Sequence, residues 1–330
     1  EISQKINQLF SAILLNQQNV NAIKASNPAK ASLLSEKLTA LEIECGRKFF
    51  YPYFSTGKGH GPFTELIDDS IKYDLIGSMG VNLLGHSHPL YIKSQLEAAL
   101  VDTCLVGNLL PYGEISQLSK YLVEQLPLSR LRHFWYASSG SQAIDNALKV
   151  IWQKSTPKYG IIAFEKCFSG RTIAGHELSY NEDYKKGMPQ YLDVSYAPYF
   201  DCNHPQQSIQ NTLQELEKIW HTKSNTLSCL ILELVQGEAG LLSGSKQFFH
   251  SVCNWAKAKN LYVIVDEIQT FGRTRELFAT KYFELESIVD VITIGKVLHA
   301  CGMLFTPELN PGPGLLGGTA IGSIAGLKLG

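Results

Sequence analysis

The stretch Leu261-Tyr-Val-Ile-Val-Asp-Glu-Ile-Gln-Thr270 decides which fold the chain is expected to adopt. Its first five residues are apolar, rich in β-branched types and too few for a helix. Such a run predicts a strand buried on both faces of a parallel sheet. The strand ends in Asp266 and Glu267, and in open α/β sheets ligands bind at the carboxyl ends of the strands. The stretch therefore predicts an α/β sheet with a polar site at one edge.

A second apolar run, Ile288 to Ile294, is followed directly by Gly295-Lys296. An acid, Asp266, and an amine, Lys296, are thus expected at the ends of two strands of one sheet. A lysine that forms a Schiff base and an aspartate that pairs with a pyridinium nitrogen are the two groups that pyridoxal 5′-phosphate (PLP) requires. Each residue taken alone also fits an ordinary turn or a solvated side chain, so this interpretation depends on further motifs.

Two other kinds of site were considered and are not favoured. The run Val263-Ile-Val-Asp-Glu267 resembles the magnesium-binding strand of a P-loop ATPase, which also needs the loop G-x-x-x-x-G-K-[ST]. Neither Gly57-Lys58 nor Gly295-Lys296 is followed by the required Ser or Thr. His86 and His88 are candidate metal ligands, but the chain has no H-E-x-x-H and no carboxylate at ligand spacing beside them. No metal is therefore expected.

Composition describes an ordinary globular protein. Of the 330 residues, 45% are hydrophobic and 18% are charged, and the net charge is −1. No basic surplus is available to attract nucleic acid or an anionic membrane, and no apolar stretch reaches the ~18 residues of a membrane span. The seven cysteines are scattered without a C-x-x-C pair, which favours a reducing cytoplasm. The chain starts without Met and stops at what reads as the start of a helix, so a fragment is expected.

Alternation of strands and helices predicts a mainly parallel, doubly wound central sheet. Residues 1–60 are predicted to form an N-terminal helical segment with a break at Asn27-Pro28, and residues 61–330 a large cofactor-binding domain. Within these, we expect a turn-rich connector at 57–62, a hairpin at 63–76 and a loop at 180–206. The other expected strands are 131–136, 159–164 and 230–235, and the other expected helices are 89–101, 114–126, 143–154, 207–221 and 245–259.

A turn of small residues, Ser138-Ser-Gly-Ser-Gln142, lies between a predicted strand and a predicted helix. Exposed backbone N–H groups and the positive end of the helix dipole favour an anion such as a phosphate at such a turn. An ordinary capped helix is the alternative. Farther along, Phe168 offers a flat apolar ring and Arg171 a fork of donors for a carboxylate.

Together these motifs resemble the class III aminotransferases, which are PLP enzymes of fold type I. The resemblance extends from about Gly61 to Thr319 and depends on several motifs in the family's order. These are Gly85-His-Ser-His-Pro89, Ser139-Gly-Ser141, Phe168-Ser-Gly-Arg-Thr172, Val235-Gln-Gly-Glu238 and Asp266-Glu-Ile-Gln-Thr270, with Lys296 downstream.

This resemblance implies a role for each matching residue. Lys296 would form the Schiff base with PLP and move a proton during the reaction, and Asp266 would keep the ring nitrogen protonated. Gln269 would bond the phenolic oxygen, and Phe168 would stack on the ring. The remaining implied contacts are Ser139, Gly140 and Ser141 to the phosphate, Thr319 to the phosphate of a neighbouring subunit, and Arg171 and Glu238 to the substrate.

The implied function is transfer of an amino group from an ω-amino acid or diamine to a 2-oxo acid, by a cytoplasmic homodimer with shared active sites. Another PLP reaction, such as epimerisation or an aminomutase reaction, stays open, as does a catalytically weak PLP-binding protein. The last alternative is motivated by Gln142 and Ser169, which depart from the family pattern, and by the family's small C-terminal domain, which is expected to be absent. The chain also departs from the pattern at Ile144 and lacks one of its glycines after Thr270, so the turn after Gln269 is expected to differ.

Overall fold

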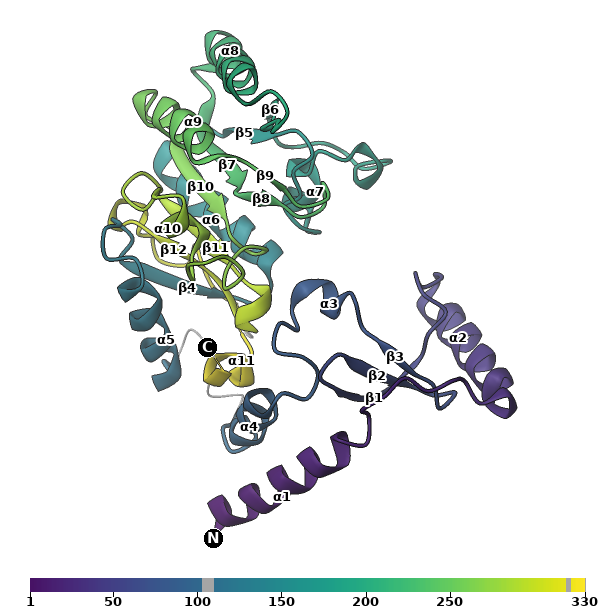
Figure 1. Ribbon diagram of the computed structural model, residues 1–330. Helices are drawn as coiled ribbons and strands as arrows, with labels where there is room; N and C mark the ends of the chain where they lie inside the picture. The colour runs from purple at the N-terminus through teal and green to yellow at the C-terminus, as the bar shows by residue number, and fades with distance from the viewer. Residues whose placement is uncertain (103–109, 319–321, 330) are drawn as a thin grey trace. The chain divides into compact units, whose positions relative to one another are not determined.

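The computed structural model describes residues 1–102, 110–318 and 322–329 (Figure 1). Their packing divides into two compact units, Glu1–Val101 and Asp102–Lys328, which are described separately. This division lies well after the boundary between residues 60 and 61 that the sequence suggested. Among the helices of the described residues, none is both long and apolar enough to span a membrane.

The N-terminal unit combines helices with a small antiparallel sheet. Helices α1 (Ile2–Gln17) and α2 (Ala31–Cys45) lie on either side of Asn27-Pro28, where the predicted helical segment was expected to break. The predicted hairpin is also confirmed, as β2 (Phe63–Leu66) and β3 (Ile71–Tyr73), and α3 (Gly77–Gly80) and α4 (Pro89–Ala98) follow it.

The predicted connector at 57–62 was wrong, because β1 (Ser55–His60) occupies most of it and pairs with β2. Its glycines suggested a turn, but at Gly59 the glycine permits a close approach. A Cβ there would lie 2.8 Å from the carbonyl oxygen of Phe63 and 2.9 Å from the Cβ of His86.

A seven-stranded sheet forms the centre of the second unit, in the order β4-β12-β11-β10-β7-β5-β6. All neighbouring pairs are parallel except those that β12 makes with β11 and β4. The predicted, mainly parallel sheet is therefore confirmed. Its strands are β4 (His133–Ala137), β5 (Gly160–Phe164), β6 (Val194–Ala197), β7 (Leu227–Glu233), β10 (Tyr262–Asp266), β11 (Val291–Ile294) and β12 (Cys301–Phe305).

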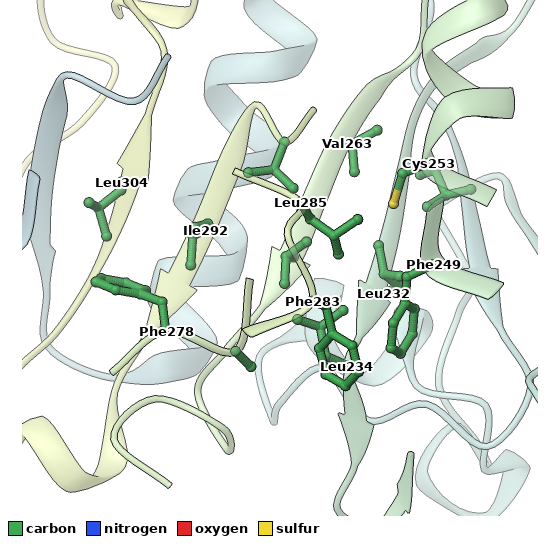
Figure 2. Packing of buried hydrophobic residues seen from close by; sticks show 14 of the residues in the cluster. Leu232, Leu234, Phe249, Cys253, Val263, Phe278, Phe283, Leu285, Ile292 and Leu304 are labelled. Carbon is green, nitrogen blue, oxygen red and sulfur yellow. The ribbon is translucent and has the colours of Figure 1, made fainter. Parts of the chain in front are cut away.

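Helices cover both faces of this sheet (Figure 1). Side chains of β10 point alternately to the two faces of the sheet. Val263 and Val265 belong to the hydrophobic cluster that includes residues of α5, α8 and α9, and Ile264 belongs to the cluster that includes residues of α6. Figure 2 shows part of the first cluster, with Val263, Ile292, Phe249 and Leu285 among its labelled residues. The helices are α5 (Gly113–Glu124), α6 (Gly140–Ser155), α7 (Ile173–Leu178), α8 (Pro205–Lys223), α9 (Lys246–Ala258), α10 (Ala279–Tyr282) and α11 (Ile324–Leu329).

Two strands of the sheet were not predicted. Strand β6 lies within the expected loop 180–206, and it is a four-residue edge strand that pairs only with β5. Strand β12 is a short apolar run whose antiparallel pairing with β11 and β4 depends on the chain reversing after Lys296. Continuing the alternation along β10 places Asp266 on the α6 face, at the edge where β4, β5, β7 and β11 also end.

Candidate active site at the carboxyl edge of the sheet

Asp266 is the last residue of β10 and is only 5% exposed. Its Oδ1 accepts hydrogen bonds from the backbone N–H of Ile268 at 2.9 Å and from the Thr293 hydroxyl at 3.0 Å. Burial raises the pKa of this carboxyl to about 6, while the two hydrogen bonds and the charge of Lys296 act in the opposite direction. The carboxylate is thus held in one orientation with its charge only partly compensated.

Lys296 follows β11 and reaches the neighbouring strand's loop. Its Nζ donates a hydrogen bond to Oε1 of Gln269, and its backbone has a left-handed φ of 46°, which a side chain other than glycine rarely adopts. Burial lowers the pKa of the half-buried amine, and the positive charge of Arg273 lowers it further. Asp266, Glu233 and Glu238 oppose that effect. The amine is therefore neutral more often than an exposed lysine would be.

The side chain of Ile268 lies between the start of α6 and Gly295, the residue before Lys296. A Cβ placed on Gly140 would lie 2.8 Å from Ile268 Cδ1, and one placed on Gly295 would lie 3.6 Å from Ile268 Cγ2. A side chain at position 140 would therefore require the end of the Ile268 side chain to shift. The first turn of α6 and the residue before Lys296 are separated by one side chain.

A reciprocal cap orders the turn that begins α6. The Ser139 hydroxyl accepts from the Gln142 N–H at 3.2 Å, and Oε1 of Gln142 accepts from the Ser138 N–H at 2.6 Å. This resembles a capping box, except that Gln142, at the third helical position, bonds the N–H of Ser138, the residue before the N-cap. Gln142 therefore performs a capping role, and Ile144, the next departure from the family pattern, is fully buried in the α6 core cluster.

The Phe168–Thr172 segment packs against the same turn. Gly170 has a φ of 110°, and a Cβ there would lie 2.2 Å from the Ser141 hydroxyl oxygen. That hydroxyl accepts a hydrogen bond from the Arg171 N–H at 3.0 Å. Ser169 is buried, and its N–H donates to the Ser179 hydroxyl at 3.0 Å.

Three residues predicted for the ring and the substrate gather around Tyr184. The Tyr184 hydroxyl donates to Oε2 of Glu238 at 3.3 Å. The guanidinium carbon of the exposed Arg171 lies 4.5 Å from the centre of the Tyr184 ring and 5.5 Å from that of Phe168. Phe168, Tyr184 and Glu238 line a cleft of about 440 Å³. Tyr184 was missed because it lies in a stretch that reads as a polar loop.

Two further charged residues were missed by the sequence interpretation. Glu233, the last residue of β7, is buried and is the register partner of Asp266. Its place at the end of an apolar strand is the same signal that identified Asp266. Nη2 of Arg273 is buried and donates to no partner among the described residues, and burial lowers the pKa of its guanidinium. Nothing in the sequence pattern placed Arg273 near Lys296.

The turn after Gln269 closes without the glycine that the family pattern contains. The Phe271 N–H donates to the Glu267 carbonyl at 2.9 Å, and the Phe271 ring is buried edge-to-face against Phe278 with 5.0 Å between centroids. Gly272 packs beside Val297, the residue after Lys296. A Cβ placed on Gly272 would lie 3.3 Å from Cγ1 of Val297. Thr319, predicted to reach a neighbouring subunit's phosphate, lies outside the described residues.

Comparisons with known proteins show the family to which the chain belongs. The family model described as "Aminotransferase class-III" matches residues 48–311. A probable 4-aminobutyrate aminotransferase of Bacillus subtilis is 29% identical over 286 residues, which are 82% of this chain and 65% of that protein. An alanine/serine racemase of Pyrococcus horikoshii is 26% identical over 301 residues, 86% of this chain and 62% of that protein.

The fold also matches a solved structure. A PLP-bound amine transaminase from an uncultivated Pseudomonas species aligns with a TM-score of 0.76 and 19% identity, covering 86% of this chain and 72% of that one. The chain therefore belongs to the class-III aminotransferase family and has the fold of PLP-dependent transaminases. It spans less than two thirds of the length of the two curated relatives described above.

Proposed function

We propose that this chain forms the cofactor-binding part of a PLP-dependent aminotransferase. The observation that carries the proposal is that Lys296 and Asp266 lie at the ends of adjacent parallel strands, joined through Gln269 and Ile268. The amine and the buried carboxyl are the two groups that the cofactor's Schiff-base carbon and ring nitrogen require. Family membership and the PLP-bound transaminase of similar fold support the same conclusion.

The donors at this edge of the sheet fit PLP. Bound there, the cofactor would supply an electron sink for the bond broken beside the substrate's amino group. The first turn of α6, at Ser139, Gly140 and Ser141, offers backbone N–H groups and a positive dipole end for the phosphate. Asp266 is ionised above its pKa of about 6 and would keep the ring nitrogen protonated. Gln269 would bond the phenolic oxygen, and Phe168 would cover the ring.

Lys296 would act both as the attachment point and as a base. Its lowered pKa raises the fraction of neutral amine, the form that attacks a carbonyl carbon and accepts a proton. Above pH 6, Lys296 would have the ionised Asp266 as a neighbour, and that charge limits how far the pKa of the amine falls.

The proposed reaction moves an amino group from an ω-amino acid or diamine to a 2-oxo acid. Arg171 would bind a substrate carboxylate, and Glu238 would face an amino group at the other end of the donor. The relative named as a 4-aminobutyrate aminotransferase acts, by its name, on a substrate of this class. We further propose a cytoplasmic homodimer in which Thr319 reaches the phosphate held by its partner.

A second PLP reaction is also supported, because one relative is named as an alanine/serine racemase. Racemisation needs the same lysine and aspartate but no amino-group acceptor. Product formation that requires a 2-oxo acid supports transfer, whereas inversion of an amino acid without any oxo acid supports the racemase alternative.

Borohydride reduction of the purified chain with added PLP tests the cofactor assignment. Reduction fixes the Schiff base as a pyridoxyl-lysine, and peptide mass mapping should find it on Lys296. Lys296→Ala should carry no adduct, whereas Lys281→Ala, which removes a lysine paired with Glu276, should be labelled like the wild type. An unlabelled wild-type chain, or a label on another lysine, would contradict the proposal.

A further inference from the structure

Glu233 and Asp266 are a pair of carboxyl groups held side by side beneath the site. They are register partners on the parallel strands β7 and β10, and register partners on neighbouring strands project from the same face of a sheet. Glu233 is 8% exposed and Asp266 is 5% exposed. Two buried acids at neighbouring positions need a specific reason, because each one costs free energy unless it is bonded or neutral.

The hydrogen bonds of Glu233 supply that reason. Its Oε1 accepts from the Phe168 N–H at 2.9 Å, and its Oε2 accepts from the Gly237 N–H at 3.4 Å. The first amide belongs to the segment after β5 and the second to the segment that ends in Glu238. One carboxyl group therefore joins two loops that approach the site from different strands.

Each of these loops supports a residue that would touch the cofactor. Phe168 itself carries the ring proposed to cover PLP. Gly237 packs directly behind Gln269, since a Cβ placed on it would lie 3.2 Å from Gln269 Cγ. Gln269 in turn accepts the hydrogen bond of Lys296. The backbone of Glu233 is itself held, because the Tyr199 hydroxyl donates to its carbonyl oxygen at 3.0 Å.

Other buried glutamates of the chain are bonded differently. Glu177 accepts the N–H groups of Tyr191 and Leu192 through one oxygen, and Glu267 accepts those of Ala279 and Thr280. The amides that each of these two acids caps are consecutive and belong to one segment, although Glu267 also accepts the nearby Thr270 hydroxyl at 3.3 Å. Glu233 differs from both, because its two oxygens serve two separate segments that converge on the site.

We propose that Glu233 is a positioning residue of the cofactor site, which fixes Phe168 and the backing of Gln269 relative to Asp266. This inference depends on the proposed function. The charge balance agrees with it. Burial and the charge of Asp266 raise the pKa of Glu233 to about 8, so near neutral pH Glu233 holds a proton and Asp266 is the ionised partner. The site then keeps its one carboxylate where the ring nitrogen requires it.

The test compares Glu233→Gln and Glu233→Asp with Glu177→Gln in the full chain. A protonated carboxyl keeps lone pairs on both oxygens and still accepts both amides, whereas glutamine presents an NH2 group, which only donates, to one of them. Aspartate is one methylene too short to reach both. PLP affinity of the apo-protein, visible circular dichroism of the bound cofactor and the apo melting temperature are measured for each variant. The circular dichroism reports the cofactor's orientation, which a general loss of stability would not change.

Both Glu233 variants should bind PLP roughly tenfold more weakly, equivalent to about 1.4 kcal/mol, and should alter the cofactor's circular dichroism. Glu177→Gln should match the wild type in both measurements. If Glu233→Gln gives no folded apo-protein, the Glu233→Asp comparison decides. Wild-type affinity and an unchanged spectrum in a folded Glu233 variant would overturn this inference alone. A wild-type chain that binds no PLP would overturn the proposed function and this inference with it.

Discussion

Thr293 donates a hydrogen bond from its hydroxyl to Oδ1 of Asp266 at 3.0 Å, and the two residues are register partners on β11 and β10. This bond favours the ionised carboxyl and lowers a pKa that burial raises to about 6. The geometry follows from the parallel pairing, which brings side chains of adjacent strands onto one face. The protonation state of Asp266 is thus set in part by a neutral residue.

Thr293→Val should therefore raise the pKa of Asp266 by about one unit, since a hydrogen bond to a charged group contributes about 1.5 kcal/mol or more. The acid limb of the pH profile for amino transfer should move to higher pH by the same amount. Thr212→Val removes a buried hydroxyl that bonds the carbonyls of Pro198 and Ser208, and it should leave the limb in place. If the acid limb of the Thr293→Val profile lies at the same pH as that of the wild type, Asp266 does not control this limb.

The part of this site that could be predicted from the sequence is the part carried by continuous apolar strands. The run before Asp266 is apolar throughout because β10 is covered on both faces. The strand and its polar end can therefore be recognised from the sequence alone. The run before Lys296 is also mainly apolar, although it contains Asp290 and Thr293. The start of α6 was predictable because its cap depends on residues three positions apart.

Contacts that depend on strand register could not be predicted in this way. The partnership of Glu233 with Asp266 requires knowing that β7 and β10 are adjacent and how they align. The bond from the Ser169 N–H to the Ser179 hydroxyl spans α7, a helix that periodicity did not reveal. Strand β6 was not predicted because it is a short edge strand that contains a polar residue, Ser195.

Glu233 should make the stability of the apo-protein depend on pH. Its pKa is raised from 4.5 to about 8 by burial, so the folded state keeps a proton that the unfolded state releases. The associated stability is present below about pH 4.5 and is lost as the pH rises toward about 8. Glu233→Gln should therefore lose less free energy of unfolding than the wild type between about pH 6 and pH 8, by roughly 1 kcal/mol or more.

Urea denaturation at a series of pH values measures this effect. Asp266→Asn is the matched comparison, because the pKa of Asp266 is raised only to about 6 and its contribution should fall off at lower pH. A Glu233→Gln protein with the wild-type slope between pH 6 and pH 8 would show that Glu233 is ionised throughout that range.

Arg273 should tune the reactivity of Lys296. Its positive charge lowers the pKa of the amine, second only to burial, and its Nη2 is buried without a partner in the described ranges. Arg273→Gln should raise the pKa of Lys296, so PLP capture by the apo-protein should require higher pH and should be several-fold slower near neutral pH. Arg275→Gln is the control, since Arg275 is exposed two residues away. Equal pH profiles for capture in the two variants would exclude this electrostatic role.

Tyr184 should affect the amino donor and leave the cofactor unaffected. Tyr184→Phe removes the hydrogen bond to Glu238 and should raise the KM of the donor about threefold, because one such bond contributes about 0.5–1.5 kcal/mol. Tyr184→Leu also removes the ring on which Arg171 lies, so a rise of roughly tenfold is expected. Steady-state kinetics and PLP binding measure both effects, with Tyr159→Leu, at an exposed ring packed on Trp152, as the control. If PLP affinity falls while the donor KM is unchanged, Tyr184 supports the ring through Phe168 and does not define the substrate cleft.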